Sequence, residues 1–149
     1  MRVKRFSLKQ AIDFHGHLGP YLVLGLMMGE YALKKIKAKA HFGLEVKAWG
    51  AANKPKSCLI DGLQLSTGCT YGKGNITKYN GKGIKVSFMN CKNKRSITCT
   101  LQDGVVEKLA LATTHQSCER LARTLYKAKT ESLFFFKRIA DGCKLTAER

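Results

Sequence analysis

Apolar residues recur at helical spacing in several stretches of the chain, and this pattern predicts helices there. Ser7 and Gln10 form the side-chain pair of a capping box at the start of the first helix. Pro20 suits the first turn of the next, which is apolar at its start and basic at its end. Gly25 and Gly29 lie four residues apart in it, so another backbone can approach that face closely. The segments with a helical pattern are residues 7–14, 20–39, 57–67 and 105–139.

Shorter stretches predict strands. Residues 42–51 alternate between apolar and polar side chains, which is typical of a strand with one buried face. The turn signal Asn80-Gly81-Lys82-Gly83 predicts that residues 76–79 and 84–89 pair as a hairpin. Residues 96–101 predict the last strand. The sequence shows no repeat, low-complexity segment or linker, so we expect a single domain over residues 1–149.

The net charge of the chain is large and positive. The sequence has 27 Lys and Arg against 10 Asp and Glu, which gives a formal net charge of +17. Such a field attracts nucleic acid, anionic membranes, acidic partner proteins or polyanionic substrates. The basic residues are spread along the chain, and no basic run is interleaved with aromatic residues as a binder of single strands would require. We therefore favour a solvated surface with an acidic partner protein over nucleic-acid binding.

Signals for export or membrane insertion are not apparent. The uncharged stretch 18–29 is shorter than the about 20 residues that a bilayer span needs. No apolar segment follows the basic N-terminal residues, so we expect a cytoplasmic protein whose six cysteines are reduced. Because no two of them form a Cys-x-x-Cys pair, we expect neither a zinc ribbon nor a zinc knuckle.

The tripeptide His15-Gly16-His17 is the first candidate for chemistry. Two histidines two residues apart point about 200° away from each other on a straight helix, but they can converge in a loop bent at glycine. Neutral imidazole is a good ligand for zinc, iron, nickel or copper, so the pair supplies half of a metal site. The alternative is structural, with one histidine capping a helix and the other hydrogen-bonded in the core.

Cys58 and Asp61 lie three residues apart in the predicted third helix and therefore project from one face. Cys69 comes about three helical turns after Cys58 and would return to that face if the helix continued past Gly68. Together the two cysteines supply the soft ligands that the histidines lack. A buried cysteine is common and usually inert, so core packing is the alternative for each.

Residues 68–75 form a glycine-rich loop that contains Lys73. It is not a P-loop, because its first glycine stands one residue too close to Gly72-Lys73 and no Ser or Thr follows the lysine. Its backbone amides can still hold an anion with Lys73 as the counter-charge. The alternative is a plain turn that requires the conformational freedom of glycine.

Four segments together resemble the FmdE family of formylmethanofuran dehydrogenase proteins. They are Phe14–Pro20, Cys58–Gln64, Thr67–Thr70 and Gly72–Asn75, in this order within roughly residues 7–101. The resemblance implies an α+β core, usually dimeric, with a small and mostly antiparallel sheet packed with helices. It implies a cleft where the histidine loop meets the cysteine-bearing helix. It also implies an association with the molybdenum or tungsten enzyme that reduces carbon dioxide onto methanofuran.

Roles of individual residues follow from the same resemblance. Zinc is the expected metal, with iron or nickel as alternatives. Asp61 is expected to fix the tautomer of a ligating histidine. The metal-capable positions are His15, His17, Cys58 and Cys69; the candidates for chemistry are Cys58, Cys69 and Asp61; the candidates for cofactor contacts are Thr67, Lys73 and Asn75.

The chain departs from the family pattern in two places. Many members carry a cysteine where this chain has Gly19, so a thiol there is missing. Many also append a C-terminal zinc finger, whereas only Cys118 and Cys143 follow residue 101 here, so we expect the core domain without that extension. His115 and Cys118 are a weaker ligand pair, for which core packing is the alternative.

We interpret the sequence as a homodimeric, metal-binding relative of FmdE, working with a molybdenum or tungsten oxidoreductase of one-carbon metabolism. The first alternative is a non-catalytic basic adaptor that docks on an acidic redox complex. The second is a nucleic-acid-binding protein, which the absence of any known recognition module disfavours.

Overall fold

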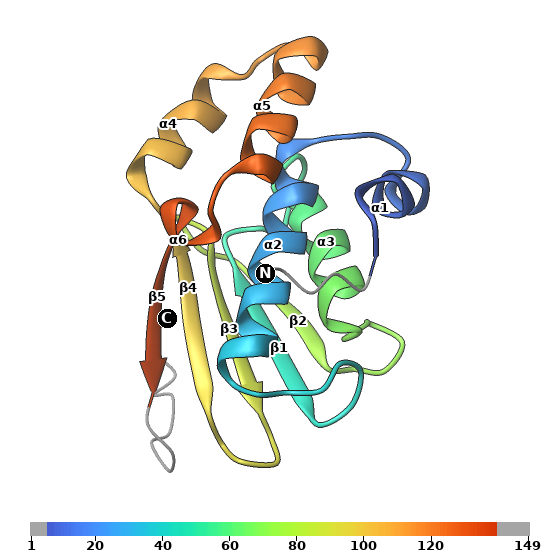
Figure 1. Ribbon diagram of the computed structural model, residues 1–149, viewed down its shortest axis with the longest axis vertical. Coiled ribbons are helices and arrows are strands. Elements are labelled where there is room, and N and C mark those ends of the chain that lie inside the picture. The colour runs from blue at the N-terminus through green and yellow to red at the C-terminus, as the bar shows by residue number, and fades with distance from the viewer. Residues whose placement is uncertain (1–5, 140–149) are drawn as a thin grey trace.

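The computed structural model describes residues 6–139, whose helices and strands are mixed along the chain (Figure 1). The helices are α1 (Leu8–His15), α2 (Pro20–Lys35), α3 (Cys58–Thr67), α4 (Asp103–Leu111), α5 (His115–Lys127) and α6 (Thr130–Leu133). The strands are β1 (Leu44–Trp49), β2 (Ile76–Tyr79), β3 (Lys85–Asn90), β4 (Ser96–Leu101) and β5 (Phe134–Ile139). Within this part of the chain, no helix has the length and apolarity needed to cross a membrane.

The strands form one sheet in the order β2-β1-β3-β4-β5. β1 and β2 are parallel, and the other neighbours are antiparallel. The prediction of an α+β fold with a mostly antiparallel sheet is therefore confirmed. A parallel pair requires a crossover connection, and α3 provides it between β1 and β2.

The predicted hairpin between residues 76–79 and 84–89 is wrong, because β1 lies between these two strands. Trp49 at the end of β1 pairs with Tyr79 of β2 on one side and with Lys85 of β3 on the other. The loop after β2 therefore passes the end of β1. Gly50 in that region has a φ of 78°, and a side chain there would collide with the carbonyl oxygen of Gly83.

The C-terminal aromatic run is the second difference from the predicted elements. It forms β5, an edge strand that pairs with β4, and is not helical. Phe134 is 2% exposed and Phe135 is 54% exposed, which is the alternation of a strand with one face on the core. Aromatic side chains favour such a half-buried pleated surface, and the free edge of β4 supplies the hydrogen-bonding partners.

α2 and α3 pack against each other with their backbones nearly in contact. A Cβ atom added to Gly25 of α2 would collide with the carbonyl oxygen of Leu59 and lie 2.9 Å from the amide nitrogen of Leu63. One added to Gly62 of α3 would collide with the carbonyl oxygen of Leu22. The close approach expected at the glycines of α2 is thus made by α3, and it fixes the two helices relative to each other.

α1 packs on a small apolar cluster and also contacts the main core through Leu8 and Ile12. Ala11 of α1 is buried there against Leu22 and Leu26 of α2 and Leu65 of α3. Ser7 caps the helix, because its side chain accepts a hydrogen bond from the amide of Gln10 while the Gln10 side chain accepts one from the amide of Ser7. The predicted capping box is therefore confirmed, and it sets where α1 begins.

Candidate metal centre

Three of the predicted site residues come together at one end of the helical layer. His15 is the last residue of α1, His17 lies in the loop before α2, and Cys58 is the first residue of α3. The ligand atoms that these side chains offer all lie within 4.8 Å of one another. The spatial convergence on which the metal hypothesis depends is present in the structure.

The loop between α1 and α2 brings the two imidazoles side by side. Gly16 ends α1 with a φ of 105°, a left-handed conformation that favours glycine, and its amide donates to the carbonyl oxygen of Ile12. Pro20 then begins α2 in the first helical turn. Between these two fixed points the rings of His15 and His17 lie with their centroids 4.6 Å apart.

Asp61 orients the ring of His15. Its carboxylate Oδ2 lies 2.6 Å from His15 Nδ1, across 46 positions of sequence. The carboxylate accepts the hydrogen bond and so favours the tautomer that carries its proton on Nδ1, which leaves the lone pair on Nε2. Asp61 stands three residues after Cys58 on α3, so one helix positions both the thiol and the group that orients an imidazole.

His15 Nε2 is buried and has no hydrogen-bond partner among the described residues. Leaving a buried polar nitrogen unsatisfied costs about 1–3 kcal/mol, so such atoms mark an absent ligand, water or ion. A second imidazole and a thiol lie beside this one, and nitrogen with sulfur is the donor set of zinc and related metals. The residues present therefore fit a transition metal.

The surroundings of the other two candidate ligands favour their uncharged forms. Desolvation raises the pKa of the Cys58 thiol, and the nearby Asp61 carboxylate raises it further, while Lys54 opposes them. Desolvation lowers the pKa of His17, and the charges of His15 and His115 add to the effect. His17 therefore offers a free lone pair near neutral pH, whereas Cys58 must lose its proton to a metal that binds it.

Cys69 is not brought to this cluster. It follows Gly68, which ends α3 with a φ of 74°, and its buried thiol donates to the carbonyl oxygen of Leu44 at 3.6 Å. Cys58 and Cys69 lie at opposite ends of α3, and eleven helical residues rise about 16 Å. Cys69 lies beyond the end of the helix, so the two sulfurs are separated along its length.

The polar residues predicted to contact a cofactor lie at that distant end as well. Their hydrogen-bonding groups hold the loop itself. Thr67 Oγ1 donates to the carbonyl oxygen of Leu63, and Lys73 Nζ donates to Thr70 Oγ1. Asn75 accepts from the amide of Thr70 and donates to the carbonyl oxygen of His41.

Near the cluster, the sequence reasoning missed Glu119 and assigned His115 a different partner. His115 and Glu119, one turn apart at the start of α5, pair at 3.1 Å between Nε2 and Oε1, and both affect the pKa of His17. Cys118, expected as the partner of His115, instead donates to the carbonyl oxygen of Ala112. Nothing in the local sequence identifies the pair, because only the packing of α5 on α2 brings it there.

The geometry predicts a measurable role for Asp61. Replacing it with asparagine is expected to weaken zinc binding about 10–100-fold, because the amide no longer stabilises the proton on His15 Nδ1. Competition titration against a chromophoric chelator measures the change. Asp13→Asn is the matched control, since Asp13 pairs with Lys9 on the exposed side of α1. Equal weakening by both substitutions would contradict this role.

A known family includes both the fold and the cluster. The family model described as "FmdE, Molybdenum formylmethanofuran dehydrogenase operon" matches residues 14–143. The chain belongs to the FmdE family. The match includes His15, His17 and Cys58, so the cluster lies within the FmdE region, and the resemblance found in the sequence is confirmed.

Two individual proteins similar to this FmdE chain add detail. An Archaeoglobus fulgidus protein described as a probable S-adenosyl-L-methionine-binding protein is 31% identical over an alignment of 105 residues, which covers 59% of this chain and 28% of that protein. The chain thus spans little more than a quarter of its relative. The crystal structure of a tungsten formylmethanofuran dehydrogenase FmdE-like protein from Syntrophus aciditrophicus matches with a TM-score of 0.62 and 22% identity, over 93% of this chain and 77% of that chain. This likeness supports the fold.

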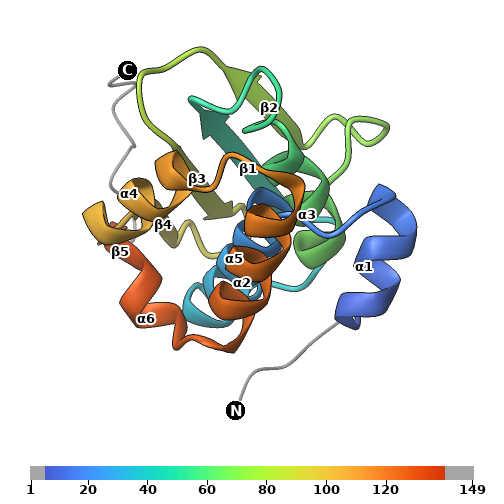
Figure 2. The ribbon, with the colours of Figure 1, turned by 90° about the horizontal axis from the view of Figure 1, so that it is seen from above.

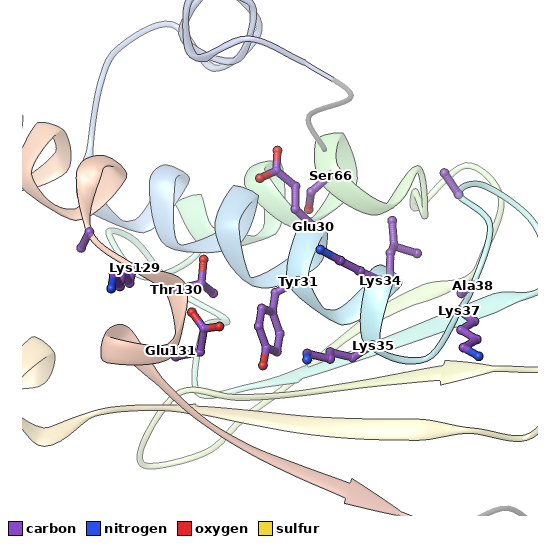
Figure 3. A pocket seen from close by; sticks show the side chains of 13 residues that line it. Glu30, Tyr31, Lys34, Lys35, Lys37, Ala38, Ser66, Lys129, Thr130 and Glu131 are labelled. Atoms are coloured by element: carbon purple, nitrogen blue, oxygen red, sulfur yellow. The ribbon is translucent and has the colours of Figure 1, made fainter. Parts of the chain in front are cut away.

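A large groove lies away from the cluster, along the C-terminal half of α2 (Figure 3). It has a volume of about 770 Å³, and neither the two histidines nor Cys58 line it. Lys34, Lys35, Lys37 and Lys129 line it together with Glu30 and Glu131. Its lining is therefore more basic than acidic, but it contains no cluster of candidate metal ligands.

Proposed function

We propose that this chain is a metal-binding FmdE protein related to formylmethanofuran dehydrogenase, and that His15, His17 and Cys58 hold one transition metal ion. The observation that carries the proposal is the buried Nε2 of His15, which lacks a hydrogen-bond partner among the described residues, on a side chain whose ligand atom lies within 4.8 Å of those of His17 and Cys58. Zinc is the expected ion for mixed nitrogen and sulfur ligands, with iron or nickel as alternatives.

The residues present would bind the ion through three side chains. A three-ligand site with an open position is typical of zinc sites that act as Lewis acids on a bound water or substrate. Asp61 would hold the His15 ring in place, and His115 with Glu119 would set the charge around His17. Cys69, predicted as a fourth ligand, would stay in the core with its thiol on Leu44.

Metal titration tests the proposal. Protein stripped with a chelator is expected to take up one equivalent of Zn²⁺, and cobalt in its place should show the visible absorption of tetrahedral nitrogen and sulfur ligation. Elemental analysis of protein purified without added metal identifies the native ion. Folded protein that takes up none of these ions would overturn the proposal.

The proposal also includes a partner enzyme and a small-molecule ligand. Membership of the FmdE family supports association with a molybdenum or tungsten enzyme of one-carbon metabolism, in the cytoplasm and as a homodimer. The name of the Archaeoglobus fulgidus relative supports S-adenosyl-L-methionine as a small molecule to be titrated against the metal-loaded protein.

A non-catalytic adaptor is the second candidate, and the lysine-lined groove along α2 favours it. An acidic segment of a redox complex would dock there, and the metal would only stiffen the other end of the molecule. His17→Ala separates the two candidates: full activity of the assembled complex with this variant would favour the adaptor, whereas lost activity with assembly intact would favour a working metal.

A further inference from the structure

The two faces of the sheet differ in what covers them, and α4 adjoins the strand ends, where its Val106 lines a hollow with Trp49 and Lys85. α2, α3 and α5 lie on one side of the sheet, as the view from above shows (Figure 2). In β1, Leu44, Val46 and Ala48 face this layer and are buried, while the alternating Lys47 and Trp49 are partly exposed. The second face of the sheet therefore presents side chains to its surroundings.

Aromatic and cationic side chains form a row across this open face. The register places Tyr79, Trp49, Lys85, Thr100 and Phe135 opposite one another on five successive strands. Neighbouring strands lie about 4.8 Å apart, so the row extends over about 19 Å. Tyr79 and Phe135 stand on the two edge strands, with the cation between them.

The side chains of this row already interact. The rings of Trp49 and Tyr79 stack with centroids 5.2 Å apart and planes 20° apart. Lys85 Nζ lies 4.7 Å from the centroid of the Trp49 ring. Tyr79 remains 39% exposed and Phe135 54% exposed, which leaves ring surface for another planar group.

Further basic groups surround the row. A second row, one step along the strands, contains Lys47 and Lys137 with Ser87 and Thr98 between them. A hollow of about 410 Å³ opens beside Trp49 and Lys85 at the ends of the strands, and Lys82 also lines it. The open face thus combines exposed rings with lysines at several positions.

We propose that the open face of the sheet binds single-stranded nucleic acid. Phosphates would contact Lys82, Lys85 and the second-row lysines, and bases would stack on the exposed rings of Tyr79 and Phe135. Proteins that bind single strands combine a basic surface with aromatic rings that accept any base, and a sheet of similar width accommodates two or three bases. The net charge of +17 provides charge complementarity to a polyanion.

The same charge argues against a second copy of the chain as the occupant. Two open faces packed together would bring Lys47, Lys85 and Lys137 of each copy against the same lysines of the other. The arrangement also explains why the linear sequence disfavours nucleic acid. The three rings of the row and Lys85 come from four different strands, so the linear sequence does not show them together.

Trp49 is the only tryptophan of the chain and therefore a direct reporter. Titration of the intact, metal-loaded protein with short oligouridine and oligothymidine is expected to change its fluorescence. Affinity should fall with salt, with a slope of log affinity against log salt of about −0.7 for each phosphate contacted. Tyr79→Ala and Phe135→Ala should each lower affinity about tenfold, and Lys85→Gln should reduce the salt slope.

Control variants and competitors decide the outcome. Tyr71→Ala removes an aromatic ring of comparable exposure outside the open face and should leave affinity unchanged. Circular dichroism establishes that each variant is folded, and two independent ring variants are used because either alone can perturb its edge strand. Equal binding of heparin with unchanged Trp49 emission and no effect of the ring variants would overturn the proposal. So would self-association that Tyr79→Ala and Phe135→Ala abolish, since a second copy would then cover the face.

Discussion

Replacing Cys58 with serine is expected to lower zinc affinity by two or more orders of magnitude and to leave the fold intact. A neutral hydroxyl is a much poorer ligand than a thiolate, and the remaining donors are two imidazoles. The loss should exceed the about 10–100-fold that removing an orienting partner such as Asp61 costs. Competition titration measures the affinity, and thermal unfolding of the metal-free variant measures the fold.

The control for this substitution is Cys91→Ser. Cys91 is an exposed cysteine beyond the end of β3, and its loss should leave one-to-one zinc binding as it was. Wild-type affinity in Cys58→Ser would place the metal elsewhere and would leave the buried His15 Nε2 without an explanation. A drop in Cys91→Ser as large as in Cys58→Ser would indicate zinc bound nonspecifically by thiols.

Gly25→Ala is expected to destabilise the protein by about 3 kcal/mol or more. The new methyl group would collide with the backbone of α3, at the Leu59 carbonyl and the Leu63 amide, and a backbone cannot move aside as a flexible side chain can. Because α2 follows His17 and α3 begins with Cys58, separating the helices should also weaken zinc binding. Denaturant unfolding with and without zinc measures both effects.

Gly104→Ala is the matched comparison in α4. An added Cβ there meets nothing within 4 Å, so the substitution should be neutral or stabilise the helix by about 0.5–1 kcal/mol. If Gly25→Ala were as stable as Gly104→Ala, the close contact of α2 with α3 would not determine the stability of the core.

The sequence predicted the positions of most helices and strands, but not which strands pair with each other. The capping box at Ser7 and the close approach at Gly25 could be predicted, because each depends on residue types at fixed short spacings: a Ser and Gln pair for the cap, and glycines without side chains for the approach. The pairing of β2 was not, since a turn signal at residues 80–83 states that the chain reverses but not that β1 lies between the strands. β5 was missed because three consecutive phenylalanines lack the alternation of a strand and were interpreted as a continuation of the helical pattern before them.

The candidate site was also predicted only in part. His15, His17 and Cys58 were expected together, and the structure brings them together. Cys69 was expected with them from the family resemblance and because it would return to the face of Cys58 if the helix continued past Gly68, but α3 ends there and its length separates the two thiols. His115 was expected only as a weak ligand partner of Cys118; its pairing with Glu119 and its position near His17 could not be predicted, because they depend on the packing of α5.

The attachment of α1 has a consequence for how the ion and the fold depend on each other. One imidazole belongs to α1, which is otherwise held by apolar contacts of Leu8, Ala11 and Ile12, and the thiol belongs to α3. An ion bound by both side chains would stabilise the packing of α1 against α3. Thermodynamic linkage then makes the effect mutual: whatever loosens α1 releases the ion more readily, and whatever removes the ion frees α1 to the same degree in free energy.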